Sequence, residues 1–305
     1  MGRWILAAII IAALGTAGCG ARAITAATLP AVATFYPLFE FARQVGGANA
    51  EVQALVPPGV EPHDYEPTPR DVAAVLRARL LVYNGAGFEP WVEELLPQIP
   101  RPAVVVEASA GLPLVSGAFG RGRSGPDPHV WLDPVLAQRQ VDNILDGFIK
   151  ADPSRRVAFT TNASRLKQDL QTLHRRYAQR LQACRRRVFI TNHAAFGYLA
   201  RRYGLEMIAI AGLAPEAEPS PAVIRDVIRQ AQRTGARVIY FETLVSPRVA
   251  ETIAREVGAT TAPLNPLEGL TDDDQRQGKH FMTVMDDNLR HLADGLDCRR
   301  SGGYR

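Results

Sequence analysis

Residues 152–184 read DPSRRVAFTTNASRLKQDLQTLHRRYAQRLQAC, and they contain the longest helical pattern in the chain. Pro153 stands at the start of the pattern, and neither glycine nor proline occurs after it. At about 1.5 Å per residue, a helix from Pro153 to Cys184 would be about 45 Å long. One compact α/β domain does not need a helix of that length, so the stretch predicts a connector between two lobes.

Strands and helices alternate on both sides of this connector. The predicted strands are residues 31–38, 51–57, 80–85 and 102–109 before it, and 187–192, 205–212, 236–242 and 259–266 after it. The predicted helices include residues 38–47, 68–79, 220–235, 246–258 and 281–296. This alternation is typical of βαβ units. The predicted fold is therefore α/β, with two lobes of mainly parallel sheets bridged by one long rigid helix.

The predicted boundaries follow from this pattern. Residues 29–152 form the N-terminal lobe, 153–185 the linking helix, 186–298 the C-terminal lobe and 299–305 a tail. Within the first lobe, Thr68 is expected to cap a helix that has Pro69 at its first position and an acidic residue in its first turn. The glycine-rich residues 115–128 predict a surface loop.

The N-terminal sequence MGRWILAAIIIAALGTAGCG has the features of a secretory signal. One arginine precedes an apolar run from Trp4 to Leu14, and small residues follow before Cys19. The run is shorter than the roughly 20 residues that a transmembrane helix needs. Residues 1–19 are therefore predicted to be a signal peptide, followed by a tether over residues 20–28.

The composition is that of an ordinary globular protein. The chain of 305 residues is 47% hydrophobic and 22% charged, with a formal net charge of +4. Its basic residues are scattered, and no basic patch alternates with aromatic residues, which excludes nucleic acid as a partner. Two cysteines remain after Cys19, namely Cys184 and Cys298, and an exported protein can join such a pair. Sequence leaves this disulfide open, because its geometry decides it.

Three of the six histidines occupy the same kind of position. His63 lies in EPHDYEPTPRD (residues 61–71), His129 in DPHVWLDP after the glycine-rich loop, and His193 directly after the predicted strand RVFITN. Loops at the carboxyl ends of parallel strands line the crevice where ligands bind. More than sixty residues separate each histidine from the next, so a site made from them has to form between the lobes.

Each of these histidines alone could be a hydrogen-bonded loop residue, but three in one class of position suggest a metal site. Neutral imidazoles suit zinc best, with copper, nickel and iron as alternatives. A tetrahedral zinc site needs one further ligand, either a carboxylate or water.

Six blocks of the sequence, in order, resemble the metal-binding lipoproteins of bacterial ABC importers for zinc and manganese, a group that includes adhesin-like lipoproteins. The blocks are ATFYPLFEFARQVGG, PPGVEPHDYEPTPRDV, VYNGAGFEPWVEELL, DPHVWLDPVLA, TNHAAFGYLARRYGL and FETLVSPRVAETIAREVGA. The resemblance covers about residue 30 to about residue 295 and implies two α/β lobes joined by a rigid helix, as the pattern predicts independently.

The resemblance also implies the metal ligands. They correspond to His63, His129 and His193, and a histidine at the third position resembles the zinc binders, whereas many manganese binders have glutamate there. Nitrogen-rich sites favour zinc, and hard oxygen ligands suit manganese. Ala17-Gly18-Cys19 resembles a lipoprotein signal in which Cys19 is lipidated, although Thr16 stands where that signal prefers an aliphatic residue.

The chain differs from the family at the position of the fourth ligand. The family commonly has aspartate there, whereas this chain has Asn265, in Leu-Asn-Pro. Water, Asn265, Glu61 or Glu242 could complete the shell. Asp64, Asp127 and Asp133 are interpreted as turn formers or as side chains that orient the imidazoles. The glycine-rich loop lacks the histidines that zinc members of the family often carry there, so it is not expected to gather metal.

The resulting hypothesis is a monomeric, extracytoplasmic Zn²⁺-binding protein, held at the membrane by a lipid anchor. It is expected to deliver its ion to an ABC permease driven by an ATPase, and not to be an enzyme. Manganese is the alternative cargo. Other classes are a zinc hydrolase with Glu242 as the base, a binder of iron chelates, and an adhesin with a structural metal.

Overall fold

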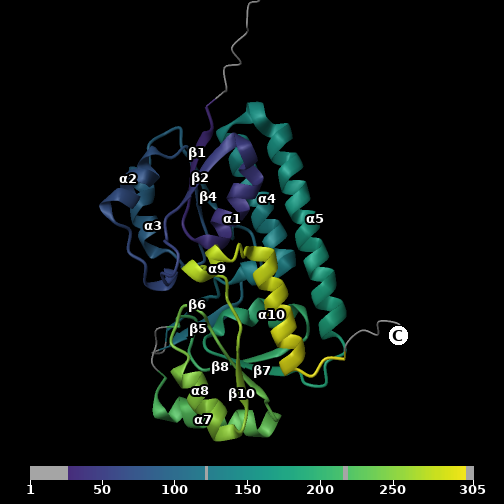
Figure 1. Cartoon of the computed structure of the whole chain (residues 1–305). Coiled ribbons are helices and arrows are strands. Elements are labelled where there is room, and N and C mark those ends of the chain that lie inside the picture. The colour runs from purple at the N-terminus through teal and green to yellow at the C-terminus, as the bar shows by residue number, and fades with distance from the viewer. Residues whose placement is uncertain (1–26, 121–122, 216–218, 300–305) are drawn as a thin grey trace, which may run out of the picture.

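The computed structural model describes residues 27–120, 123–215 and 219–299. They form two α/β lobes, each built on a four-stranded parallel sheet, as predicted (Figure 1). The predicted signal peptide with Cys19, residues 20–26 of the tether and residues 300–305 of the tail lie outside the described residues.

The N-terminal sheet has helices on both faces. Its strands are β1 (Leu29–Ala33), β2 (Ala50–Ala54), β3 (Leu80–Tyr83) and β4 (Val104–Glu107), in the order β2-β1-β3-β4. Helices α1 (Tyr36–Gly46) and α4 (Pro134–Ala151) cover one face, and α2 (Pro69–Arg77) and α3 (Pro90–Leu95) the other. Leu80 and Val82 pack toward α1 and α4 and Leu81 toward α2 and α3, because successive side chains of a strand point to opposite faces.

Four short 3₁₀ helices also lie in the described part of this half. They are η1 (Gly47–Asn49), η2 (Pro62–Asp64), η3 (Leu96–Gln98) and η4 (Val130–Leu132). Helix α2 begins as predicted, since the Thr68 side chain accepts from the backbone N–H of Asp71 and the two residues form a capping box. The predicted strand 31–38 is too long, because Pro37 lies in the first turn of α1, where proline favours a helix start.

The C-terminal sheet follows the same plan. Its strands are β7 (Val188–Thr191), β8 (Glu206–Ala209), β9 (Val238–Phe241) and β10 (Thr260–Pro263), in the order β10-β9-β7-β8. Helices α7 (Pro221–Thr234) and α8 (Arg248–Val257) cover one face, while α6 (Gly197–Arg202) and α10 (Phe281–Gly295) pack on the other. The remaining short elements are η6 (Ala194–Phe196) and α9 (Asp272–Arg276).

The connection between the sheets is η5 (Pro153–Arg155) followed by α5 (Arg156–Leu181). Helix α5 has 26 residues and ends three residues before Cys184, so it is slightly shorter than predicted. It runs along both lobes (Figure 1). A single stripe faces the core, made of Phe159, Ala163, Leu166, Leu170, Leu173, Tyr177 and Leu181. The lobe boundaries at residues 152 and 186 remain predictions.

Helix α10 lies beside α5 and forms a second brace between the lobes (Figure 1). The Tyr177 hydroxyl of α5 donates a 2.6 Å hydrogen bond to the Met285 carbonyl of α10. At the start of α10, the ring of Phe281 lies 4.8 Å from that of Phe41 on α1. The last helix therefore also contacts the N-terminal lobe.

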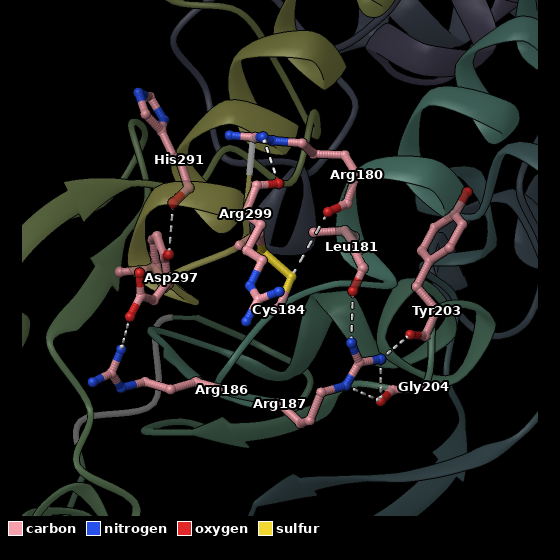
Figure 2. The surroundings of a disulfide bond; sticks show 12 residues. Arg180, Leu181, Cys184, Arg186, Arg187, Tyr203, Gly204, His291, Asp297 and Arg299 are labelled. Carbon is pink, nitrogen blue, oxygen red and sulfur yellow. Dashed lines mark hydrogen bonds and ion pairs between the residues drawn. A yellow bond between two sulfur atoms is a disulfide. The ribbon is translucent and has the colours of Figure 1, made fainter. Parts of the chain in front are cut away.

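A disulfide joins Cys184 and Cys298, just beyond the ends of α5 and α10 (Figure 2). Beside it, the Arg187 side chain donates to the carbonyls of Leu181, Tyr203 and Gly204 (Figure 2). These contacts tie the end of the linking helix to the C-terminal sheet.

The predicted surface loop at residues 115–128 is instead partly regular. It holds an antiparallel pair of strands, β5 (Ser116–Gly120) and β6 (Arg123–Pro126). The pairing continues for one more residue, because the backbone N–H of Asp127 donates to the Val115 carbonyl. The glycines that suggested a loop also allow two short strands to pair closely. Within residues 27–120, 123–215 and 219–299, no helix is both long and apolar enough to cross a membrane.

Candidate metal centre

His63 is held at the lip of the N-terminal lobe by a proline-rich turn. Pro62 begins η2, and the Glu61 carboxylate accepts a hydrogen bond from the backbone N–H of His63 at 3.2 Å. The imidazole stands edge-on to the ring of Phe88, with 4.7 Å between ring centroids. The turn therefore presets the direction of this side chain.

His129 lies between β6 and η4 and is completely buried. One oxygen of Asp127 accepts from both the backbone N–H of His129, at 3.0 Å, and its Nδ1, at 2.7 Å. The C-terminal lobe holds this loop as well, since the Tyr198 hydroxyl donates to the Asp127 carbonyl at 2.8 Å. Asp133, four residues after His129, forms an ion pair with Arg202 of the C-terminal lobe at 2.8 Å.

His193 follows β7 after one residue and is also completely buried. Glu242 directly follows β9, the neighbour of β7 in the sheet. Because the carboxyl ends of parallel strands share one edge of a sheet, the Glu242 carboxylate reaches His193. It accepts from the backbone N–H at 3.0 Å and from Nδ1 at 2.7 Å.

Glu268 approaches the histidines from the segment after β10. This segment is fixed to the first lobe on both sides of Glu268, because Trp131 Nε1 donates to the Pro266 carbonyl at 2.8 Å and the N–H of Gly59 donates to the Leu270 carbonyl at 2.9 Å. The Glu268 side chain is buried, with the residue 1% exposed.

These four side chains converge on one point between the lobes. Glu268 Oε1 lies 3.2, 3.0 and 3.2 Å from the Nε2 atoms of His63, His129 and His193. The Nε2 atom of His129 is 3.3 Å from that of each of the other two histidines. Histidine, cysteine and acidic side chains can all bind metals. Among the described residues, His63, His129, His193 and Glu268 are the group whose ligand atoms lie close enough together to hold a metal ion.

The carboxylates behind the rings determine which nitrogen faces this point. A carboxylate that accepts a hydrogen bond at Nδ1 favours the tautomer with its proton there, and Nε2 is then free to bind a metal. Asp127 has this role for His129 and Glu242 has it for His193. The arrangement is common around metal-ligating histidines.

Electrostatics matches the geometry. Burial opposes protonation of His193, but the charges of Glu242 and Glu268 outweigh it and hold the pKa of His193 well above its usual value. For His129, burial is likewise outweighed by hydrogen bonds to Asp127 and Glu268, and the pKa is raised. Burial lowers the pKa of His63. Burial alone would raise the pKa of Glu268, but the charges of His193 and His63 hold it well below its usual value. In the metal-free centre these shifts favour an ionised Glu268, protonated His129 and His193, and a neutral His63.

Comparison with known proteins agrees with this centre. A family model described as "Zinc-uptake complex component A periplasmic" (ZnuA) matches residues 31–295. The chain belongs to this ZnuA family.

The sequences of ZnuA family members align with nearly the whole chain. The high-affinity zinc uptake system protein ZnuA of Bacillus subtilis is 38% identical over 97% of both chains. The zinc-binding lipoprotein AdcA of Streptococcus pneumoniae is 37% identical over 94% of this chain, which spans 60% of that longer relative. The crystal structure of the Zn(II)-bound ZnuA-like domain of AdcA superposes with a TM-score of 0.78 at 38% identity, covering 89% of this chain and 100% of that domain.

The structure brings together the three histidines expected from the family pattern, but none of the expected fourth ligands joins them in the described group. Asn265 uses its side chain otherwise, accepting from the N–H of Leu267 at 2.7 Å and donating to Thr243 at 3.0 Å. Glu242 faces Nδ1 of His193, away from the point of convergence. The described group therefore contains Glu268, and not Asn265, Glu61 or Glu242, beside the three histidines; the identity of the fourth ligand stays a prediction.

Glu61 lies close to the centre and needs a separate explanation. Burial and the negative charge of Glu268 raise the pKa of Glu61 to about 9. In the metal-free protein this shift favours the protonated form of Glu61, and its carboxylate lies outside the group of converging ligand atoms. Its contact with the backbone N–H of His63 gives it a role in shaping the turn.

Proposed function

We propose that this chain is the extracytoplasmic binding protein of an ABC importer for zinc. It captures Zn²⁺ with His63, His129, His193 and Glu268 and hands the ion to a membrane permease driven by an ATPase. The relatives named for zinc uptake and zinc binding support this cargo, since they match the chain over both lobes.

One observation carries the proposal, namely the spacing of the four donor atoms. Tetrahedral zinc with ligand bonds of about 2.0–2.1 Å places its donors roughly 3.3 Å apart. The five donor–donor distances quoted above run from 3.0 to 3.3 Å. The side chains thus surround a space of the size that a zinc ion requires.

The donor set favours zinc over manganese. Three imidazole nitrogens and one carboxylate oxygen form a nitrogen-rich shell, whereas manganese prefers hard oxygen ligands. Manganese is the second candidate cargo, because His63, His129, His193 and Glu268 could also form part of a larger shell completed by water.

The same shell argues against a zinc hydrolase. Catalytic zinc sites keep one position open for water, while four protein donors fill a tetrahedral shell. Glu242, the candidate base, already accepts two hydrogen bonds from His193. A binding role without catalysis is therefore the better fit.

Location and partners complete the proposal. The N-terminal signal and the family support export, with Cys19 as the lipidated residue that anchors a monomer at the membrane. Cys19→Ala should move the protein from the membrane fraction to the soluble fraction of expressing cells. Recovery of the variant in the membrane fraction at the parent level would contradict lipid anchoring.

The test of the function is a titration of the metal-stripped protein with Zn²⁺ and with Mn²⁺ by calorimetry. The parent should bind one zinc tightly and manganese weakly, and His193→Ala should lose tight binding. His174→Ala is the matched control, because His174 lies on α5 and contacts Tyr203 instead of the centre. Absence of tight zinc binding by the parent would overturn the proposed function, and tighter binding of manganese would reassign the cargo.

A further inference from the structure

Leu267, the residue before Glu268, has a backbone conformation that is rare for its type. Its φ angle is +60°, in the left-handed region that bulky residues seldom adopt. Its side chain is completely buried in the main hydrophobic core. Leu267 therefore anchors the chain in the core while its backbone turns the next residue, Glu268, toward the three imidazoles.

Asn265 stabilises this turn. Its Oδ1 accepts a 2.7 Å hydrogen bond from the N–H of Leu267, two residues on, which is the Asx-turn arrangement. The residue is itself 7% exposed, so the hydrogen bond is largely protected from water. A strained conformation persists only where its surroundings hold it, and this contact is one that holds Leu267 directly.

Asn288 of α10 fixes Asn265 in turn. Its Oδ1 accepts from the backbone N–H of Asn265 at 2.9 Å, and its Nδ2 donates to the Asn265 carbonyl at 2.7 Å. Asn288 is 2% exposed and lies on the helix that packs against α5. The two asparagines therefore connect the Glu268 segment to the brace between the lobes.

The other end of the Asn265 amide reaches a second part of the centre. Its Nδ2 donates to the Thr243 hydroxyl at 3.0 Å, and Thr243 directly follows Glu242, which orients His193. A single side chain thus links the segment of Glu268 to the segment of Glu242.

We propose that Asn265 and Asn288 are positioning residues that hold Glu268 against the three imidazoles and thereby set the affinity for zinc. This inference rests on the proposed function, because it concerns the same centre. Asn265 acts through Glu268 and does not bind the ion itself, since both atoms of its amide already have partners within the protein.

The test compares Asn265→Ala with Asn265→Asp in zinc titrations of the full chain. The alanine variant should bind zinc about 10- to 100-fold more weakly, as is typical when a residue that orients a metal ligand is removed. The aspartate variant should restore tight binding, because one oxygen can accept from Leu267 and the other can accept from the Thr243 hydroxyl. Asn143→Ala, which removes an amide bonded to Ala108 and Ala110 in the first lobe, is the matched control and should bind as the parent does.

A double-mutant cycle with Glu268→Ala separates positioning from a general structural role. If Asn265 acts through Glu268, Asn265→Ala should cause little further loss in the Glu268→Ala background. The absorption spectrum of the cobalt(II)-loaded protein should also differ between parent and Asn265→Ala, since an oxygen ligand is misplaced. Equal losses in both backgrounds would show a structural role and overturn the inference.

The remaining outcomes are also distinct. Parent-like zinc affinity in Asn265→Ala would overturn the inference while leaving the proposed function intact. A parent protein that binds no zinc would overturn the proposed function itself. Should Asn265→Ala fail to fold, Asn288→Asp serves instead, because it keeps the acceptor for Asn265 and loses the donor. Weaker zinc binding by Asn288→Asp is then expected, and unchanged binding would overturn the inference.

Discussion

The Nε2 atoms of His129 and His193 lie 3.3 Å apart, although the two rings belong to different lobes and both are completely buried. Each also faces the same oxygen of Glu268, at 3.0 and 3.2 Å. Two nitrogen lone pairs and a carboxylate pointing at one another repel unless positive charge lies among them. The raised pKa values of His129 and His193 favour protons in this role in the metal-free protein, and a bound metal ion would replace them.

Zinc affinity should therefore depend strongly on pH. Because Glu242, Glu268 and Asp127 raise the pKa values of His193 and His129 despite burial, these imidazoles hold protons that zinc has to displace. At pH values below these raised pKa values, zinc has to displace protons from the imidazoles. For each displaced proton, the zinc affinity should fall about tenfold when the pH drops by one unit. It should level off only once the pH exceeds them.

Competition titrations between about pH 5 and 8 would measure this dependence. Calorimetry in buffers with different ionisation enthalpies would count the released protons. An affinity that does not change with pH would show that the imidazoles are already neutral in the metal-free protein.

Glu268→Gln should weaken zinc binding more than about a hundredfold, since even residues that only orient ligands contribute 10- to 100-fold. The amide keeps the shape of the side chain but removes the charge. Glu61→Gln is the informative control, because the pKa of Glu61 is raised to about 9 and the group is already neutral at pH 7. The zinc affinity of Glu61→Gln should hardly change. Equal losses of zinc affinity in Glu268→Gln and Glu61→Gln would refute the distinction between the two carboxyl groups.

Asp127→Ala should lower zinc affinity by about 10- to 100-fold through loss of the hydrogen bond to Nδ1 of His129. Asp127→Asn should lose less, since its oxygen can still accept that bond and only the charge is gone. Asp64→Asn, an exposed change next to His63, is the control and should bind as the parent does. Calorimetric titration of the three variants would test the order of affinities.

Replacing both Cys184 and Cys298 by serine should lower the free energy of unfolding by about 2–5 kcal/mol, because the disulfide closes a long loop in the unfolded chain. The two residues are separated by 114 positions. Urea unfolding without reductant would measure the difference. A reductant should destabilise the parent and leave the double variant unchanged; a reductant effect on both would point to another cause.

The positions of the three histidines could be predicted because strand ends are visible in the sequence. In a parallel sheet, the loop after each strand reaches the same edge, and the histidines in such loops of the two lobes converge. His193 shows this most directly, since it follows β7 after a single residue. The role of Glu242 follows from the same rule, although the sequence did not show that β9 lies next to β7.

Glu268 could not be predicted in this way. It lies in an irregular segment, and its direction depends on the left-handed conformation of Leu267, which leucine rarely adopts. That conformation is held by Asn265, and Asn265 by Asn288, 23 residues further along the chain. The family resemblance pointed to position 265, but only the folded chain shows that the Asn265 amide bonds to Leu267 and Thr243 and that Glu268, three residues later, faces the imidazoles.

The Trp131 indole, which donates a hydrogen bond to the Pro266 carbonyl, is placed to act as an internal fluorescent reporter of the centre. The Trp131 indole lies 5.2 Å from the ring of His129 and donates to the segment that carries Glu268. The Trp131 side chain is completely shielded from solvent, whereas Trp91 is partly exposed and Trp4 lies in the predicted signal peptide. Occupation of the centre changes the charge beside the indole, so tryptophan emission can follow zinc capture and release in real time without any label.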